Sequence, residues 1–144
     1  MSELNLAAAN VIVTTALQRA REQNMKPMTV AVLDAGGHLL AFQRQDGSSI
    51  LRPQIANAKA WGALGMGLGS RALGARAESH PHFFAALTDI SGGRIVPVAG
   101  GVLVKNAAGH ILGAVGVSGD LPDADEACAV RGIVAAGLQA DTGA

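Results

Sequence analysis

The chain has 144 residues, 49% of them hydrophobic and 15% charged, with 11 Lys and Arg residues against 11 Asp and Glu residues. This length and apolar content predict one folded domain over residues 1–144 and exclude a charge-rich disordered segment. A formal net charge of zero argues against a nucleic-acid partner, since general nucleic-acid binders need a basic face. The low charge also leaves little electrostatic resistance to self-association, so we expect a homo-oligomer.

The first half predicts a helix, a β-hairpin and three further helices. In chain order these are a helix over residues 3–24, strands over 28–33 and 38–44, and helices over 53–64, 71–78 and 81–87. Apolar residues recur at helical spacing in the first segment, with Ser2 as its N-cap. The strands are short apolar runs joined by a turn that contains Gly36 and Gly37, and Pro53 suits the first turn of the next helix.

The second half predicts another hairpin followed by a helix. Its strands cover residues 101–105 and 110–117, and the last helix runs from 123 to about 138. Asp123 and Glu126, three residues apart, resemble a capping box for this helix. Residues 95–98 can add a fifth strand, although Pro97 would confine that strand to an edge or a bulge.

The two hairpins resemble each other in sequence. Residues 34–41 align with residues 106–113 at an offset of 72, and His38 and His110 occupy matching positions. Two unrelated hairpins with similar turns would also look alike, but the matched histidines and following helices favour a ββα repeat. The predicted fold is therefore α/β, of the α+β type, with a single central antiparallel sheet of about five strands flanked by helices.

No stretch approaches the run of about 18 apolar residues expected of a membrane helix, which argues against a membrane partner. Residues 1–5 lack the basic start and apolar core of a signal peptide, so we expect a cytoplasmic protein. Cys128 is the only cysteine, which excludes an internal disulfide and a multi-cysteine metal site.

Several motifs occur in an order that resembles the GlcG/HbpS-like family. They are VLDAGGH at 32–38, RQDG at 44–47, ANAKA at 56–60, PVAGGV at 97–102 and ILGAVGVSG at 111–119, followed by Asp125. The resemblance implies a compact domain with a central antiparallel sheet that assembles into octamers or other even-numbered oligomers. Some members bind haem, and others accompany glycolate use, catabolic enzymes or a corrinoid adenosyltransferase. The resemblance therefore implies a small-ligand or tetrapyrrole-related role.

The corner at residues 44–47 is the first candidate site, because it lies between a strand end and a helix. Arg44 could bind the carboxylate of a small acid or a propionate, with Asp46 and Gly47 beside it; alternatively, Arg44 and Asp46 brace the corner. Lys59 on the next helix is within reach of the corner. It is either solvated or, if its alanine neighbours bury it, a base or imine former, with Asp46 as a second catalytic candidate.

Backbone groups near glycines form a second set of candidates. Gly100 and Gly101 could offer their N–H groups to a ligand's oxygens, or they could simply permit tight turns. Ser118 and Gly119 precede the last helix, whose positive end could hold an anion, or they could cap that helix.

The segment His80-Pro81-His82 is the third candidate. Its imidazoles could contact haem, whereas a zinc or iron site would need a third ligand, for which Glu78 is the best candidate; we therefore assign no metal site. The first helix offers haem no His, Cys or Tyr ligand, and the chain has no tyrosine. The aromatic residues that could pack on a porphyrin are Phe42, Trp61, Phe83 and Phe84.

Three functions remain open at this point. The chain is a small-ligand-binding accessory protein for haem or another small anion, an enzyme acting on a small carbonyl or carboxylic acid compound, or a structural oligomer in a catabolic complex. Binding ranks first because no nucleophile triad, phosphate loop or dinucleotide motif supports a sharper enzymatic class.

Overall fold

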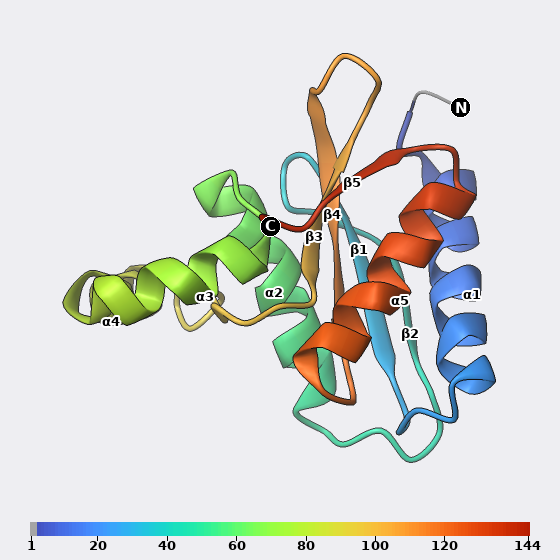
Figure 1. The fold of residues 1–144 in the computed structure, drawn as a ribbon, viewed down its shortest axis with the longest axis horizontal. Coiled ribbons are helices and arrows are strands. Elements are labelled where there is room, and N and C mark those ends of the chain that lie inside the picture. Colours follow the sequence, from blue (N-terminus) through green and yellow to red (C-terminus); the bar gives the residue numbers. More distant parts are fainter. Residues whose placement is uncertain (1–2) are drawn as a thin grey trace.

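The structure, a computed structural model, describes residues 3–144 as one open sheet with helices on both faces (Figure 1). The helices are α1 (Leu6–Glu22), α2 (Arg52–Met66), α3 (Ser70–Ser79), α4 (Pro81–Ile90) and α5 (Pro122–Ala135). The strands are β1 (Thr29–Asp34), β2 (Leu39–Arg44), β3 (Gly101–Lys105), β4 (Ile111–Ser118) and β5 (Gln139–Asp141). Among residues 3–144, no helix is long and apolar enough to cross a membrane.

The sheet has the strand order β2-β1-β4-β3-β5, and every pair of neighbouring strands is antiparallel. The predicted α+β fold with one antiparallel sheet is therefore confirmed. The prediction of a strand over residues 95–98 is wrong, because the fifth strand is β5. Pro97 has no N–H for a ladder, and Ile95 instead packs between α2 and α4 with Leu73 and Phe84.

The two hairpins match in detail. Asp34 Oδ1 accepts the backbone N–H of His38 at 2.9 Å, and Asn106 Oδ1 accepts that of His110 at 2.9 Å. The register of each hairpin shifts at equivalent positions, between residues 32 and 33 and between residues 104 and 105. The helix after each hairpin lies on a different face of the sheet, so the repeat is clearest in the hairpins themselves (Figure 1).

The main core lies between the sheet and the helix pair α1 and α5 (Figure 1). Valines at alternate positions of three strands, β1, β3 and β4, face these helices, and all are fully buried: Val30, Val32, Val102, Val104, Val115 and Val117. The opposite face combines leucine with alanine and glycine, and there α2 packs Ala60 and Ala63 against Leu103 and Ala114. The small residues of this face bring α2 close to the sheet.

The starts of α1 and α5 differ from the predictions. Asn5 is the N-cap of α1 and its side chain accepts the N–H of Ala8 at 2.9 Å, whereas Ser2 lies outside the described residues. The predicted capping box of α5 is wrong, since no side chain caps that helix. Asp123 and Glu126 instead bind Arg71 of α3, with Arg71 Nε 3.0 Å from Glu126 Oε2.

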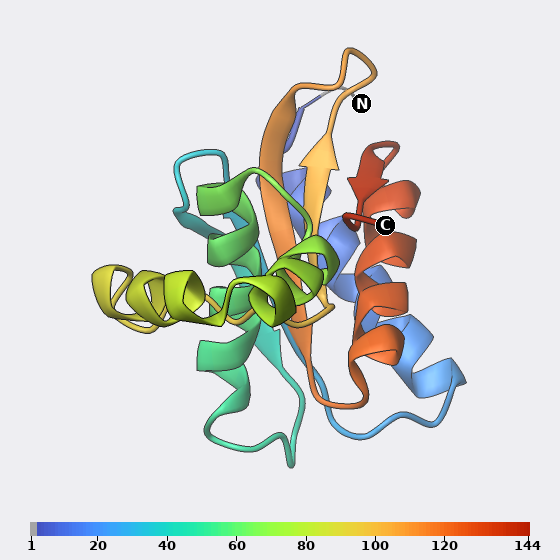
Figure 2. The ribbon, with the colours of Figure 1, turned by 60° about the vertical axis from the view of Figure 1, so that its left-hand side comes forward.

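Helices α3 and α4 form an arm that projects from the body of the domain (Figures 1 and 2). Leu73, Phe84 and Leu87 hold the arm to Ile95 through a small apolar cluster. The outer surface of α4 leaves Phe83 and Ile90 exposed.

Candidate functional site

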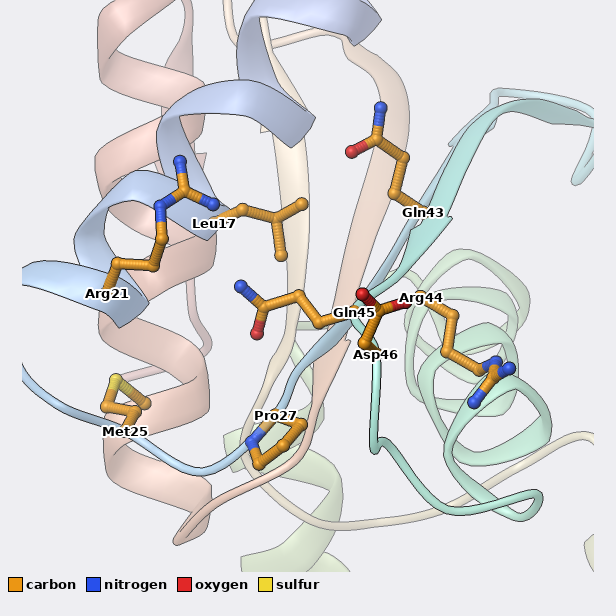
Figure 3. A pocket seen from close by; sticks show the side chains of 8 residues that line it. All are labelled: Leu17, Arg21, Met25, Pro27, Gln43, Arg44, Gln45 and Asp46. Carbon is orange, nitrogen blue, oxygen red and sulfur yellow. The ribbon is translucent and has the colours of Figure 1, made fainter.

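A cavity of about 500 Å³ lies between α1 and the end of β2 (Figure 3). It includes residues 44–46 of the predicted corner at 44–47. Its walls come from both elements and the segment between α1 and β1: Leu17, Arg21, Met25, Pro27, Gln43, Arg44, Gln45 and Asp46. Three residues of the predicted corner therefore line a cavity.

The side chains at this cavity differ in where they point. In Figure 3 the Arg44 side chain turns away from α1, and its Nη1 donates to the carbonyl of Ser48 at 2.6 Å. Arg44 thus braces the corner, and Arg21 on α1 supplies the cation of the opposite wall. Gln45 is fixed because its Oε1 accepts the Met28 N–H at 2.8 Å. The cavity can hold a small anion beside Arg21 and amide groups.

Gly47 lies just beyond this cavity and has a φ of 83°, a left-handed conformation that favours glycine. A Cβ there would lie 3.5 Å from Pro27 Cγ. Gly47 therefore acts in the turn of the corner, and the structure shows no ligand-facing role for it.

Lys59 lies on α2, away from the corner, and its buried side chain reaches Asp125 of α5. Its Nζ is 3.2 Å from Asp125 Oδ2 and donates to the carbonyl of Val117 at 3.0 Å. The two charged side chains are only 4% and 1% exposed, and Asp125 Oδ1 also accepts the Asp120 N–H at 2.9 Å. Burial lowers the pKa of Lys59 and raises the pKa of Asp125.

This arrangement makes Lys59 a link between two helices on opposite faces of the sheet. Lys59 and Asp125 are each other's partner in an ion pair, so neither is a free acid or base. Sequence reasoning missed Asp125 as the partner, because the two residues are 66 positions apart. The structure does not bring Lys59 together with Arg44 and Asp46.

The glycine and serine candidates surround this ion pair. A Cβ at Gly100 would lie 2.7 Å from Lys59 Nζ, and the N–H of Gly101 donates to Ser70 Oγ at 2.7 Å. Ser118 Oγ accepts a hydrogen bond from Arg52 at 3.0 Å, and the Gly119 backbone packs against Met28. These residues have protein partners here and permit close packing around Lys59.

The segment His80-Pro81-His82 spans the junction of α3 and α4, and its two histidines have different surroundings. His80 lines a cavity of about 240 Å³ with Arg76 and three apolar side chains, Met66, Phe83 and Phe84. The rings of Phe83 and Phe84 meet edge to face, with centroids 5.9 Å apart. His82, on the first turn of α4, is exposed and does not line this cavity. Within residues 3–144, no three His, Cys, Asp or Glu side chains are grouped to hold a metal ion.

Solved structures share the fold over nearly the whole chain. A complex of PduOC with heme matches with a TM-score of 0.84 at 23% identity, covering 94% of this chain and 96% of that one. A Klebsiella pneumoniae protein, ORFY, matches with a TM-score of 0.85 at 26% identity, covering 95% and 92%. A double mutant of Streptomyces reticuli HbpS matches with a TM-score of 0.79 at 29% identity, covering 93% and 87%.

No curated protein matches this sequence. The family model described as "Haem degrading protein HbpS-like" matches residues 4–134. The match covers most of the described strands and helices, including the motifs at 32–38 and 111–119. The chain therefore belongs to the HbpS-like family.

Proposed function

We propose that this chain is a small-ligand-binding accessory protein and that its ligand is haem, held at the arm pocket formed by Met66, Arg76, His80, Phe83 and Phe84. The observation that carries the proposal is that one pocket joins an imidazole, a guanidinium and apolar walls. The family and the complex of PduOC with heme support the same ligand class.

The residue types of the arm pocket suit haem. An imidazole such as that of His80 is a common axial ligand of haem iron, and a guanidinium such as that of Arg76 pairs with a propionate. Phe83 and Met66 offer ring and thioether contacts to the edge of a macrocycle. When bound, haem would supply a redox-active iron, and these residues would hold and orient it.

The volume of the arm pocket limits how haem can sit there. About 240 Å³ falls below the roughly 300–1,000 Å³ typical of complete ligand pockets. The pocket therefore accommodates one edge of the macrocycle. The larger cavity beside α1 fits haem less well, because it has no histidine and its Met25 sulfur already accepts the Cys128 S–H at 3.6 Å.

A hemin titration followed in the Soret region tests this proposal. We expect a saturable band with the unaltered chain and affinity weakened by about tenfold or more, equivalent to ~1.4 kcal/mol, in His80→Ala. His82→Ala is the matched control, because His82 is two residues away and outside the pocket; its affinity should stay within about twofold of the original. A featureless titration, or equal losses in both variants, would contradict the proposal.

We also propose that the chain forms an even-numbered homo-oligomer through the arm. Ile90 is 79% exposed and Phe83 is 54% exposed on a helix that projects from the domain. Exposed apolar side chains on a chain with no net charge favour burial against a second copy.

Light scattering after size-exclusion chromatography measures this association. We expect the unaltered chain to be an even-numbered oligomer, with an octamer as the resemblance implies, and Ile90→Glu to be smaller because a charge would be buried. Val134→Glu is the control, since Val134 on α5 is 59% exposed and lies away from the arm. A monomer at micromolar concentration, or dissociation by the control alone, would overturn the proposal.

A further inference from the structure

Helix α2 and the segment after α4 line a second polar cavity, which is open to solvent and separate from the arm pocket. The cavity has a volume of about 260 Å³, and its polar lining comes from Gln54 and Asn57 on α2 and from Arg94. An apolar cavity of about 340 Å³ adjoins it at Gln54 and Asn57, with Leu39 and Phe42 of β2 in its wall. We call the two together the α2 groove; it shares no lining residue with the arm pocket.

Arg94 is held in place before any ligand arrives. Its Nε donates to the carbonyl of Ser91 at 2.7 Å, and its Cζ lies 4.0 Å from the centre of the Trp61 ring. Stacking on an indole and one fixed hydrogen bond restrict the rotamers of this long side chain. Binding through the guanidinium therefore loses little additional conformational entropy.

The remaining donors of Arg94 have no protein partner in the described part of the chain. Across residues 3–144, neither terminal nitrogen of Arg94 makes a hydrogen bond, and no carboxylate pairs with the guanidinium. The side-chain amides of Gln54 and Asn57 likewise make no hydrogen bond within those residues. A fork of guanidinium donors beside amide donors is suited to a carboxylate.

We propose that the α2 groove binds a small amphipathic carboxylic acid. The carboxylate pairs with Arg94 and accepts a hydrogen bond from Asn57, and a short hydrocarbon chain extends past Gln54 towards Leu39 and Phe42. The charged end of the ligand occupies the polar cavity, and its hydrocarbon end occupies the apolar cavity. This site is independent of the haem proposal, because the two pockets have no residue in common.

Trp61 provides the readout, because it is the only tryptophan and lies under Arg94. The experiment titrates the full chain with sodium acetate, butyrate and hexanoate at constant ionic strength and follows Trp61 emission, with 1-hexanol as the uncharged control. We expect saturable changes for the carboxylates, and affinity that rises at least about threefold for each added pair of methylene groups. Hexanol should give no saturable change.

Two variants test the polar end of the α2 groove. Arg94→Lys retains the charge but loses the planar fork, and hexanoate affinity measured by calorimetry should fall by about tenfold or more. Asn57→Leu leaves the Arg94–Trp61 contact intact and should also weaken binding. Arg76→Lys in the arm pocket is the control and should bind hexanoate like the original chain.

The proposal is overturned if hexanoate gives no saturable signal, if hexanol binds equally well, or if Arg94→Lys binds hexanoate unchanged. Hemin titration of Arg94→Lys distinguishes this failure from a failure of the haem proposal. That variant should keep its Soret titration, because Arg94 does not line the arm pocket.

Discussion

Replacing Lys59 with methionine is expected to lower the free energy of unfolding by about 3–5 kcal/mol, because it leaves a buried carboxylate without its partner. The side chains of Lys59 and Asp125 are 4% and 1% exposed, so water cannot replace the lost ammonium. The variant also removes the donor to the Val117 carbonyl. Urea unfolding followed by circular dichroism measures the loss.

A second Lys–Asp pair in the same chain is the matched control. Lys105 Nζ lies 2.6 Å from Asp141 Oδ2, but these side chains are 27% and 37% exposed. Lys105→Met should therefore lower the free energy of unfolding by only about 1 kcal/mol or less. Equal losses for Lys59→Met and Lys105→Met would show that burial does not set the strength of these pairs.

The loss in Lys59→Met should depend on pH in a definite direction. Burial raises the pKa of Asp125 above its value in the unfolded chain, so the folded state takes up a proton more readily. Removing Lys59 takes away the charge that opposes this rise. The deficit relative to the unaltered chain should therefore be smallest in acid and should grow as pH rises through the folded-state pKa of Asp125.

A double variant that removes both charges tests whether the unpaired carboxylate causes the loss of stability in Lys59→Met. Lys59→Met combined with Asp125→Asn has no buried charge at this position, and Asn can still accept the Asp120 N–H through its side-chain oxygen. It should recover part of the stability lost in Lys59→Met and lose the pH-dependent deficit. A double variant that is less stable than Lys59→Met would contradict the assignment.

Local patterns were enough to predict the hairpins, but the fifth strand depends on distant contacts. The residues of β1 to β4 are apolar runs beside glycine turns, and both hairpins form within a few positions of the chain. β5 has only three residues and no apolar run, and it pairs with β3 more than thirty positions away. Its ion pair between Lys105 and Asp141 has no local signature in the sequence.

At the candidate site, too, local sequence indicates where a residue lies, whereas distant contacts set which way its side chain points. Residues 44–46 of the predicted corner at 44–47 line a cavity where a strand end meets a loop, yet the direction of Arg44 is set by the Ser48 carbonyl. The alanines around Lys59 are compatible with burial or with a solvated lysine, and the residue that decides between them, its partner Asp125, comes from another helix. The sequence alone does not distinguish His80 from His82. Only His80 lines a pocket, because the chain breaks between α3 and α4 at this point.

The contact between α2 and the sheet requires glycine at positions 101 and 116. Gly101 pairs with Gly116 across β3 and β4, and both lie beneath α2. A Cβ at Gly101 would overlap the Lys59 carbonyl, and one at Gly116 would overlap the Ala56 carbonyl. Because these obstacles are backbone atoms of a helix, no change of rotamer can relieve them.

Gly116→Ala is therefore expected to lower the free energy of unfolding by about 3 kcal/mol or more, or to prevent folding, because α2 cannot approach the sheet. Gly65→Ala is the matched control: Gly65 is an exposed residue of α2 whose added Cβ would lie 3.9 Å from the Trp61 ring. It should raise the free energy of unfolding by about 0.5–1 kcal/mol through helix propensity. Urea unfolding of both variants separates steric from conformational effects of alanine. If Gly116→Ala unfolds like the original chain, α2 does not need this close approach, and the packing that places Asn57 and Lys59 must have another origin.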